Sequence, residues 1–270
     1  MIEEESFPSD FSLTVLYQLW KKKGSREDLY NHRYIHMKDW LPRLTEALTV
    51  SLMKEDVLSS GNKFQIGGIP GHRVEEHLVV VKALIQLQVQ RKSGVILQLV
   101  DIEKFFDSEI LRTVMTSLNE ANINKKAYRC WFKLNEKTKI SVETPAGTTE
   151  TADVAEIVAQ GSGGAALASG LDIARGLESQ FSGSTDEISY GCVRLQPLAY
   201  QDDIARLAST VNCTRAGSQK LSAMMDQKGL RCHPTKTVCI AVGSNKYREN
   251  IKKGKPPSNV WKLQSKVCQS

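Results

Sequence analysis

The sequence lacks several features that mark whole classes of protein. None of its six cysteines belongs to a Cys-x-x-Cys pair, which indicates reduced thiols rather than a zinc site or a disulfide framework. No apolar run reaches the roughly 18 residues that a membrane-spanning helix requires, so no membrane partner is expected. The chain begins with Met-Ile-Glu-Glu-Glu-Ser, which is acidic and has no apolar core, so we expect no secretory signal. These absences predict an intracellular protein of the nucleus or the cytoplasm.

The composition is that of a globular chain with a mild basic excess. Its 270 residues, of which 41% are hydrophobic, suit one large domain or two subdomains that share an interface. The net charge of +6 is consistent with a polyanionic partner, although many proteins without one are equally basic. Residues 246–266 carry seven lysines or arginines against the single acid Glu249. This stretch is either a solvated tail or a phosphate contact whose affinity would fall steeply with salt.

The spacing of apolar residues predicts helices and strands in irregular alternation. Helices are expected at residues 40–52, 74–88 and 218–228, in a small-residue stretch from Gln160-Gly161 to residue 178, and after a cap at Asp107 or Ser108. Strands are expected at residues 94–101, 140–142, 148–157, 193–198, 204–208 and 237–242. This pattern favours an α+β fold in which helices cover one face of a sheet.

Two adjacent aspartates interrupt an apolar run in the last third of the chain. Asp202 and Asp203 follow Leu-Ala-Tyr-Gln and precede Ile-Ala, in a place where unpaired charge would be costly to bury. A hairpin could carry both acids in its turn, and Asp101 ends a strand that is apolar apart from Gln98. Three such carboxylates could hold two Mg²⁺ ions about 4 Å apart, which would clamp an in-line phosphoryl displacement. The alternative is an acidic surface turn, with Asp101 as a helix N-cap.

Six segments in order resemble the motifs of reverse transcriptases. Val-Asp-Ile-Glu-Lys-Phe-Phe-Asp-Ser at residues 100–108 is similar to the first catalytic motif, and Tyr-Gln-Asp-Asp at 200–203 is similar to the Tyr-x-Asp-Asp motif. Ala-Gln-Gly at 159–161 resembles the Gln-Gly motif, and Gly-Leu-Arg-Cys-His-Pro-Thr-Lys-Thr at 229–237 resembles the fourth palm motif. Residues 22–35 and 65–78 are similar to two fingers blocks. Over residues 15–243 the resemblance is nearest to enzymes of non-LTR (LINE-like) retroelements, with group II intron enzymes as a nearby possibility.

The resemblance implies a right-hand polymerase of α+β class, with fingers and a palm whose antiparallel sheet is backed by helices. The fingers would comprise residues 1–93, the palm residues 94–243 with some inserted fingers elements, and a basic tail residues 244–270. A thumb is expected to be missing or vestigial, because the chain stops soon after the last palm strand. The implied activity is that of an RNA-directed DNA polymerase, a nucleotidyltransferase that uses an RNA template, a DNA primer and dNTPs. The oligomeric state is left open.

The resemblance also implies roles for the residues around the acids. Asp101 and Asp202 would be the principal ligands of two Mg²⁺ ions, which Mn²⁺ could replace. Asp203 would be an accessory ligand, or would only shape the turn. Lys236 would donate a proton to the departing pyrophosphate, unless it is a solvated lysine. Tyr200 would lie beside the substrate.

A second group of residues would bind the incoming nucleotide, again by resemblance. Phe106 stands where reverse transcriptases place an aromatic gate against the sugar 2′-hydroxyl, although a plain core phenylalanine is the alternative. Gln160 and Gly161 would position the nucleotide and template, because glycine permits close backbone approach and a helix start offers free N–H groups to phosphate. Arg33 would grip the triphosphate by bidentate contact, and Lys23 would do so more weakly.

Several positions depart from the family pattern. Ser-Gly-Gly follows Gln160-Gly161 where the family has a polar residue and then a Ser-Pro step. Ile69 stands in place of a fingers arginine, and Tyr34 in place of a proline. One alternative is therefore a degenerate, inactive retroelement fragment that at most binds nucleic acid. Another is an RNA-dependent RNA polymerase, which Phe106 disfavours because such enzymes usually carry an acid there.

Overall fold

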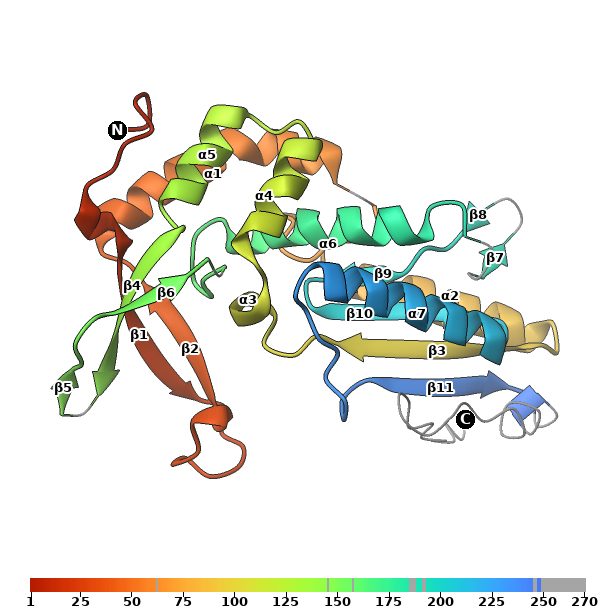
Figure 1. Cartoon of the computed structure of the whole chain (residues 1–270). Coiled ribbons are helices and arrows are strands. Elements are labelled where there is room, and N and C mark those ends of the chain that lie inside the picture. The colour runs from red at the N-terminus through yellow and green to blue at the C-terminus, as the bar shows by residue number, and fades with distance from the viewer. Residues whose placement is uncertain are drawn as a thin grey trace. The chain divides into compact units, whose positions relative to one another are not determined.

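The structure is a computed structural model that describes residues 1–61, 63–144, 146–156, 158–184, 188–190, 193–244, 247 and 248. The chain forms two compact units, each built from two segments of the sequence: Met1–Ser60 with Phe106–Asp172, and Gly61–Phe105 with Ile173–Ser270 (Figure 1). The expected division at residues 93 and 94 concerns functional subdomains and stays a prediction. Within the described ranges, no helix is both long and apolar enough to cross a membrane. Almost all of the basic tail lies outside the described residues, as do two of the cysteines, Cys192 and Cys268.

The first unit combines a five-stranded sheet with a cluster of helices. The strands follow the order β2-β1-β4-β5, with β6 also paired to β4, and have the bounds β1 Leu13–Trp20, β2 His32–Met37, β4 Lys137–Thr144, β5 Gly147–Thr148 and β6 Ala152–Ala155. The helices are α1 Trp40–Ser60, α3 Phe105–Ser108 at the junction, α4 Leu111–Glu120, α5 Lys125–Lys133 and the first part of α6 Ala165–Phe181, besides the short 3-10 turns Ser9–Ser12 and Leu29–Asn31. Their core includes Met53, Leu111, Leu118, Trp131 and Ala168.

The second unit is built on a four-stranded antiparallel sheet in the order β11-β3-β10-β9. The strands are β3 Gly94–Asp101, β9 Leu198–Tyr200, β10 Asp203–Ala208 and β11 Val238–Gly243, and a separate pair consists of β7 Ser189–Tyr190 and β8 Val193–Arg194. Two helices, α2 Val74–Gln90 and α7 Val211–Gln227, pack on this sheet, and the rest of α6 belongs to the same unit.

The helices of the second unit cover both faces of the sheet, so the expectation of a single covered face was wrong. Val95 of β3 packs with residues of α2, whereas its neighbour Ile96 packs with Val211 of α7. Successive side chains of a strand point to opposite faces, and Figure 1 accordingly shows α7 in front of the sheet and α2 behind it. The reason is that β3 is apolar at both sets of alternate positions, as in strands buried on both sides.

Most expected elements are present, but several differ in their bounds; the helix expected at residues 218–228, for example, begins at Val211. The cap expected at Asp107 or Ser108 was wrong: both lie in α3, and α4 begins after Ile110, where the Leu111 amide donates to the Glu156 carbonyl at 2.8 Å. The strand expected at residues 193–198 is divided between β8, which pairs with β7, and β9, which pairs with β10. The strand expected at residues 148–157 is likewise divided between β5 and β6, while Ile157 lies outside the described residues.

Candidate active site

Two of the acids lie opposite each other on neighbouring strands. Asp101 ends β3 and Asp203 begins β10, and the antiparallel register pairs these two residues. Directly opposed residues project to the same face with Cβ atoms roughly 5 Å apart. Tyr200 pairs with Asp203 across the hairpin, so Gln201 and Asp202 form its two-residue turn. Gln201 is left-handed, with φ of 58°, as short hairpin turns require. The hairpin thus places three carboxylates at one end of the sheet.

A buried glutamine braces this turn from the segment that precedes α2. The Gln65 side chain is 2% exposed, and its Oε1 accepts hydrogen bonds from the amides of Gly67 at 3.0 Å and Gln201 at 3.2 Å. The Ile66 amide donates to the Ala199 carbonyl at 3.1 Å, which adds a short parallel edge to β9. A Cβ at Gly67 would lie 2.3 Å from the Gln201 nitrogen. The motif pattern marked this segment, but it gave Gln65 no role, because its partner lies 136 residues away.

Lys236 forms an ion pair with the carboxylate of Asp101. Its Nζ lies 3.1 Å from Oδ1 and 3.0 Å from Oδ2. The segment that carries Lys236 is held to the end of β3, because the His233 amide donates to the Asp101 carbonyl at 2.7 Å and Ile102 bridges to Cys232. The lysine side chain is 60% exposed and the aspartate 22%. This ammonium therefore neutralises one acid of the group while remaining open to solvent.

Asp202 and Asp203 lie where their charged forms are disfavoured. Burial raises the pKa of Asp202 above its usual range, and the Asp203 and Asp101 carboxylates raise it further, while a backbone hydrogen bond and, less strongly, Lys236 oppose the shift. Partial burial and then the Asp101 carboxylate also raise the pKa of Asp203. A like charge nearby disfavours ionisation in this way. A cation among these oxygens would relieve the repulsion.

The donor set fits a hard divalent cation that shares its ligands with a substrate. Carboxylate oxygens are the ligands Mg²⁺ prefers, and Mg²⁺ is usually held by one or two carboxylates together with waters and phosphates. Within the described ranges, no group of three His, Cys, Asp or Glu side chains is arranged to hold a metal ion by itself. Asp101, Asp202 and Asp203 could contribute oxygen ligands to such an ion, and waters or phosphates would have to complete its coordination.

The raised pKa values predict how the stability of the metal-free chain depends on pH. A carboxyl whose pKa is higher in the folded than in the unfolded state binds more protons when folded, so its stabilising contribution is present at low pH and is lost as pH rises through the folded pKa. We therefore expect Asp202→Asn to raise the melting temperature near neutral pH by about 1–3 °C, with a difference from the native chain that shrinks toward about pH 4. Thermal melts of both proteins in chelator across this range measure the effect. A native chain that melts above the variant at pH 7 would contradict it.

The other predicted residues belong to the first unit, apart from Tyr200 at the end of β9. Phe106 is partly buried and packs against the helical core. Arg33 on β2 and Lys23 in the preceding loop are exposed. Gln160 and Gly161 lie in a turn before α6, which begins at Ala165 rather than at the Gln-Gly step as expected. The structure thus brings the three acids, Tyr200 and Lys236 together in one unit, and their assigned roles stay predictions.

Solved polymerase structures share this fold. Apo telomerase from Candida tropicalis matches 89% of this chain and 45% of its own, at 10% identity and a TM-score of 0.66. Telomerase from Candida albicans in complex with a fragment of telomeric RNA matches 86% of this chain and 43% of its own, at 12% identity and a TM-score of 0.55. A chain of an RdRp complex matches 84% of this chain and 20% of its own, at 13% identity and a TM-score of 0.50.

No protein-family model and no curated protein sequence matches the chain. The chain spans less than half the length of these three structures. The likeness is therefore one of fold: a reverse-transcriptase-like polymerase fold of α+β class, with an antiparallel palm sheet backed by helices.

Proposed function

We propose that this chain is the fingers and palm of an RNA-directed DNA polymerase, which adds dNTPs to a primer 3′-hydroxyl and derives from a non-LTR retroelement. The observation that carries the proposal is the group of Asp101, Asp202 and Asp203 at one end of an antiparallel sheet. The fold shared with telomerase supports it, as does the RNA bound in one of those structures. The motif resemblance is the ground for the retroelement origin and for the choice of RNA as template.

The acids would act as the metal site of this reaction. Asp101 and Asp202 would hold two Mg²⁺ ions, with Asp203 as an accessory ligand, because all three contribute hard oxygen donors. Bound there, the ions supply activation of the primer hydroxyl and neutralisation of the charge on the departing pyrophosphate. Lys236 lies at the edge of this group, where its Nζ would donate a proton to the pyrophosphate.

The first unit would supply the nucleotide contacts. Arg33 and Lys23 are exposed cations that suit phosphate, with arginine able to make two parallel hydrogen bonds. Gly161 has φ of 110°, a backbone conformation that favours glycine, and the motif resemblance would place it beside the nucleotide. Phe106 would exclude the 2′-hydroxyl of a ribonucleotide, and the choice of dNTPs over rNTPs follows from that assignment.

Primer extension tests the proposal directly. A DNA primer annealed to RNA should be extended by the native chain with Mg²⁺ and dNTPs, and chelator should stop the reaction. With rNTPs the rate should fall by about 10²-fold, the order of discrimination that a fitted pocket provides. A preference for rNTPs would contradict the gate role of Phe106 and favour an RNA-dependent RNA polymerase. Extension that persists in excess chelator would contradict the metal site.

A binding module without catalysis is the second candidate. The observation in its favour is that Lys236 contacts both oxygens of Asp101, while the described residues contain no group of three His, Cys, Asp or Glu side chains that could hold a metal ion. Such a module would bind RNA with an affinity that falls steeply with salt. It would incorporate no nucleotide with either Mg²⁺ or Mn²⁺, and this outcome separates the two candidates.

A further inference from the structure

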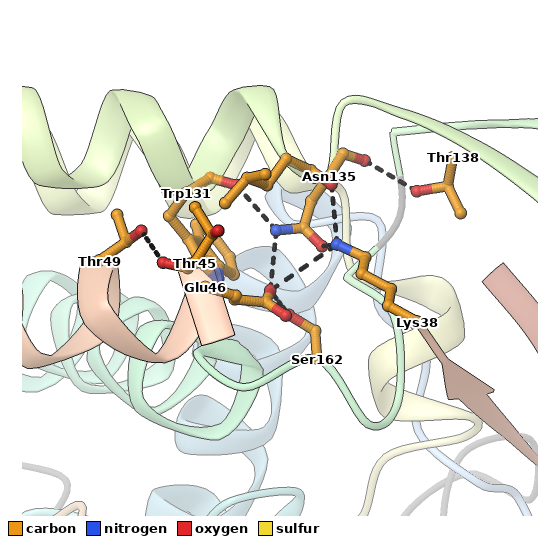
Figure 2. Close-up of polar contacts among 9 residues, drawn as sticks. Lys38, Thr45, Glu46, Thr49, Trp131, Asn135, Thr138 and Ser162 are labelled. Carbon is orange, nitrogen blue, oxygen red and sulfur yellow. Dashed lines mark hydrogen bonds and ion pairs between the residues drawn. The ribbon is translucent and has the colours of Figure 1, made fainter. Parts of the chain in front are cut away.

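A buried polar network lies beneath the turn of residues 160–162, within the first unit (Figure 2). Its centre is the carboxylate of Glu46, on α1, which is 1% exposed. Glu46 Oε1 accepts hydrogen bonds from the Ser162 hydroxyl and from Asn135 Nδ2, the latter at 3.0 Å, and lies 3.9 Å from Lys38 Nζ. One oxygen atom thus connects the turn to α1, to the end of α5 and to the residue that follows β2.

The other members of the network are held from several directions. Lys38 Nζ donates to the Leu134 carbonyl and to Asn135 Oδ1, each at 2.8 Å. Asn135 Nδ2 also donates to the Trp131 carbonyl at 2.7 Å. Figure 2 shows Ser162 reaching Glu46 from the side opposite Asn135. Glu46 is therefore held by contacts that do not involve the turn. The hydrogen bond from the Ser162 hydroxyl to Glu46 then holds the turn to this network.

The turn is also fixed to β2 through its backbone. The His36 amide donates to the Gln160 carbonyl at 2.8 Å, and the Ser162 amide donates to the Ala159 carbonyl at 3.0 Å. A Cβ at Gly161 would lie 2.7 Å from the His36 carbonyl oxygen. The turn thus lies directly against the strand that carries Arg33, and small displacements of it would alter both backbone bonds.

A buried ion pair is an expensive way to obtain stability. Burial lowers the pKa of Lys38, and the charge of the nearby Glu46 carboxylate opposes that shift, so Glu46 is the counter-charge of this buried lysine. Well-packed apolar residues often stabilise a protein as much as such a pair or more. A role in fixing geometry accounts for the charged pair better than stability alone.

We propose that Glu46 is a positioning residue whose carboxylate, through Ser162, holds the 160–162 turn on β2 in the place that nucleotide binding requires. The effect on nucleotide binding rests on the proposed function, whereas the claim that Glu46 fixes the turn of residues 160–162 does not. Glu46 itself is a poor residue to replace, because its loss would leave Lys38 buried without a counter-charge. Ser162→Ala removes the bond to the turn and leaves the rest of the network intact.

Two measurements test this role in the full chain. Hydrogen exchange should be about tenfold faster in Ser162→Ala at the His36 and Ser162 amides, the expected effect of one hydrogen bond to a charged group. In primer extension the KM for dNTP should rise by about tenfold with kcat changed less than about twofold, the pattern of lost binding. Ser162→Thr keeps the hydroxyl and should behave like the native chain in both measurements.

Thr138→Val is the matched control. It removes a buried hydroxyl that donates to the Asn135 carbonyl at 3.1 Å on the far side of the network, and it should change neither exchange in the turn nor KM. Equal effects of the two variants, or unchanged exchange in Ser162→Ala, would overturn the proposal. Faster exchange with an unchanged KM would overturn its nucleotide part. A native chain that extends no primer would contradict the proposed function, while the exchange comparison would still decide whether Glu46 holds the turn.

Discussion

Asp202→Asn should abolish primer extension, with a rate loss on the order of 10³-fold or more. The substitution keeps the shape of the side chain and removes the charge that would hold a metal ion. Asp101→Asn should cause a loss of similar size, because its carboxylate lies at the same end of the sheet. Single-turnover extension with saturating dNTP measures the effect on the chemical step without contributions from product release.

Thermal melts of Asp202→Asn, compared with its extension rate, separate the loss of a metal ligand from the loss of the fold. Burial and the neighbouring carboxylates raise the pKa of Asp202, so its neutralisation should leave the fold at least as stable. Asp203→Asn is the internal control: it removes an equal charge one residue away, and an accessory ligand should cost less than Asp202. Extension that survives Asp202→Asn would contradict the assigned metal site, and equal losses in Asp202→Asn and Asp203→Asn would contradict their different roles.

The acids could be predicted from the sequence because their signals are local. Asp101 ends an apolar run, and Asp202 and Asp203 interrupt another, so the pattern predicts a strand end at Asp101 and a turn near the other two. The structure confirms that β3 ends at Asp101 and that a two-residue turn separates β9 from β10. The register that pairs Asp101 with Asp203 could not be predicted from local sequence, because the two paired residues are 102 positions apart. The brace at Gln65 was missed for the same reason.

Helix α1 shows how apolar spacing can predict a helix and still misplace its buried face. Leu44, Leu48 and Leu52 have helical spacing, and α1 is present, yet these side chains are 50–54% exposed. The buried face instead carries Thr45, Glu46 and Thr49 among its residues. Asn135, which donates a hydrogen bond to Glu46, lies 89 residues from it in sequence. A polar face is buried where its groups find partners. Thr45 and Thr49 donate to carbonyls of α1 itself, whereas the partners of Glu46 lie elsewhere in the chain, and the sequence pattern of α1 contains no information about them.

Arg206 likewise interrupts an apolar run and is nonetheless only 1% exposed. Its guanidinium donates to Gln98 Oε1 at 3.1 Å and to the carbonyls of Cys213 and Thr214 at 2.6 and 3.3 Å. The two carbonyls belong to the first turns of α7, so Arg206 fixes this helix to the strand that begins with Asp203. The helix can approach only because residue 217 is glycine: a Cβ there would lie 1.9 Å from Arg206 Cζ.

Gly217→Ala should therefore destabilise the chain by about 3 kcal/mol or more, the combined scale of overpacking and of a disturbed buried charge. Alanine favours a helix by about 1 kcal/mol over glycine, so helix propensity acts against a net loss, and we expect the loss to come from the collision with Arg206, whose guanidinium is buried and hydrogen-bonded. Urea denaturation measures it. Ser222→Ala, at an exposed position of the same helix, should stay within about 0.5 kcal/mol of the native chain.

A double-mutant cycle identifies the cause. Arg206→Met removes the guanidinium and leaves room for the new methyl group, so Gly217→Ala should cost at least about 1 kcal/mol less in the Arg206→Met background than in the native chain, a coupling of the size seen between residues in contact. The same cost in both backgrounds would show that the collision with Arg206 is not the source of the loss. Arg206 lies on the strand that begins with Asp203, so extension activity shows whether α7 holds the acids opposite each other. If β10 keeps its register, Gly217→Ala and Arg206→Met should each lose activity only in proportion to their unfolded fraction. A larger loss would show that α7 is needed to keep the acids in place.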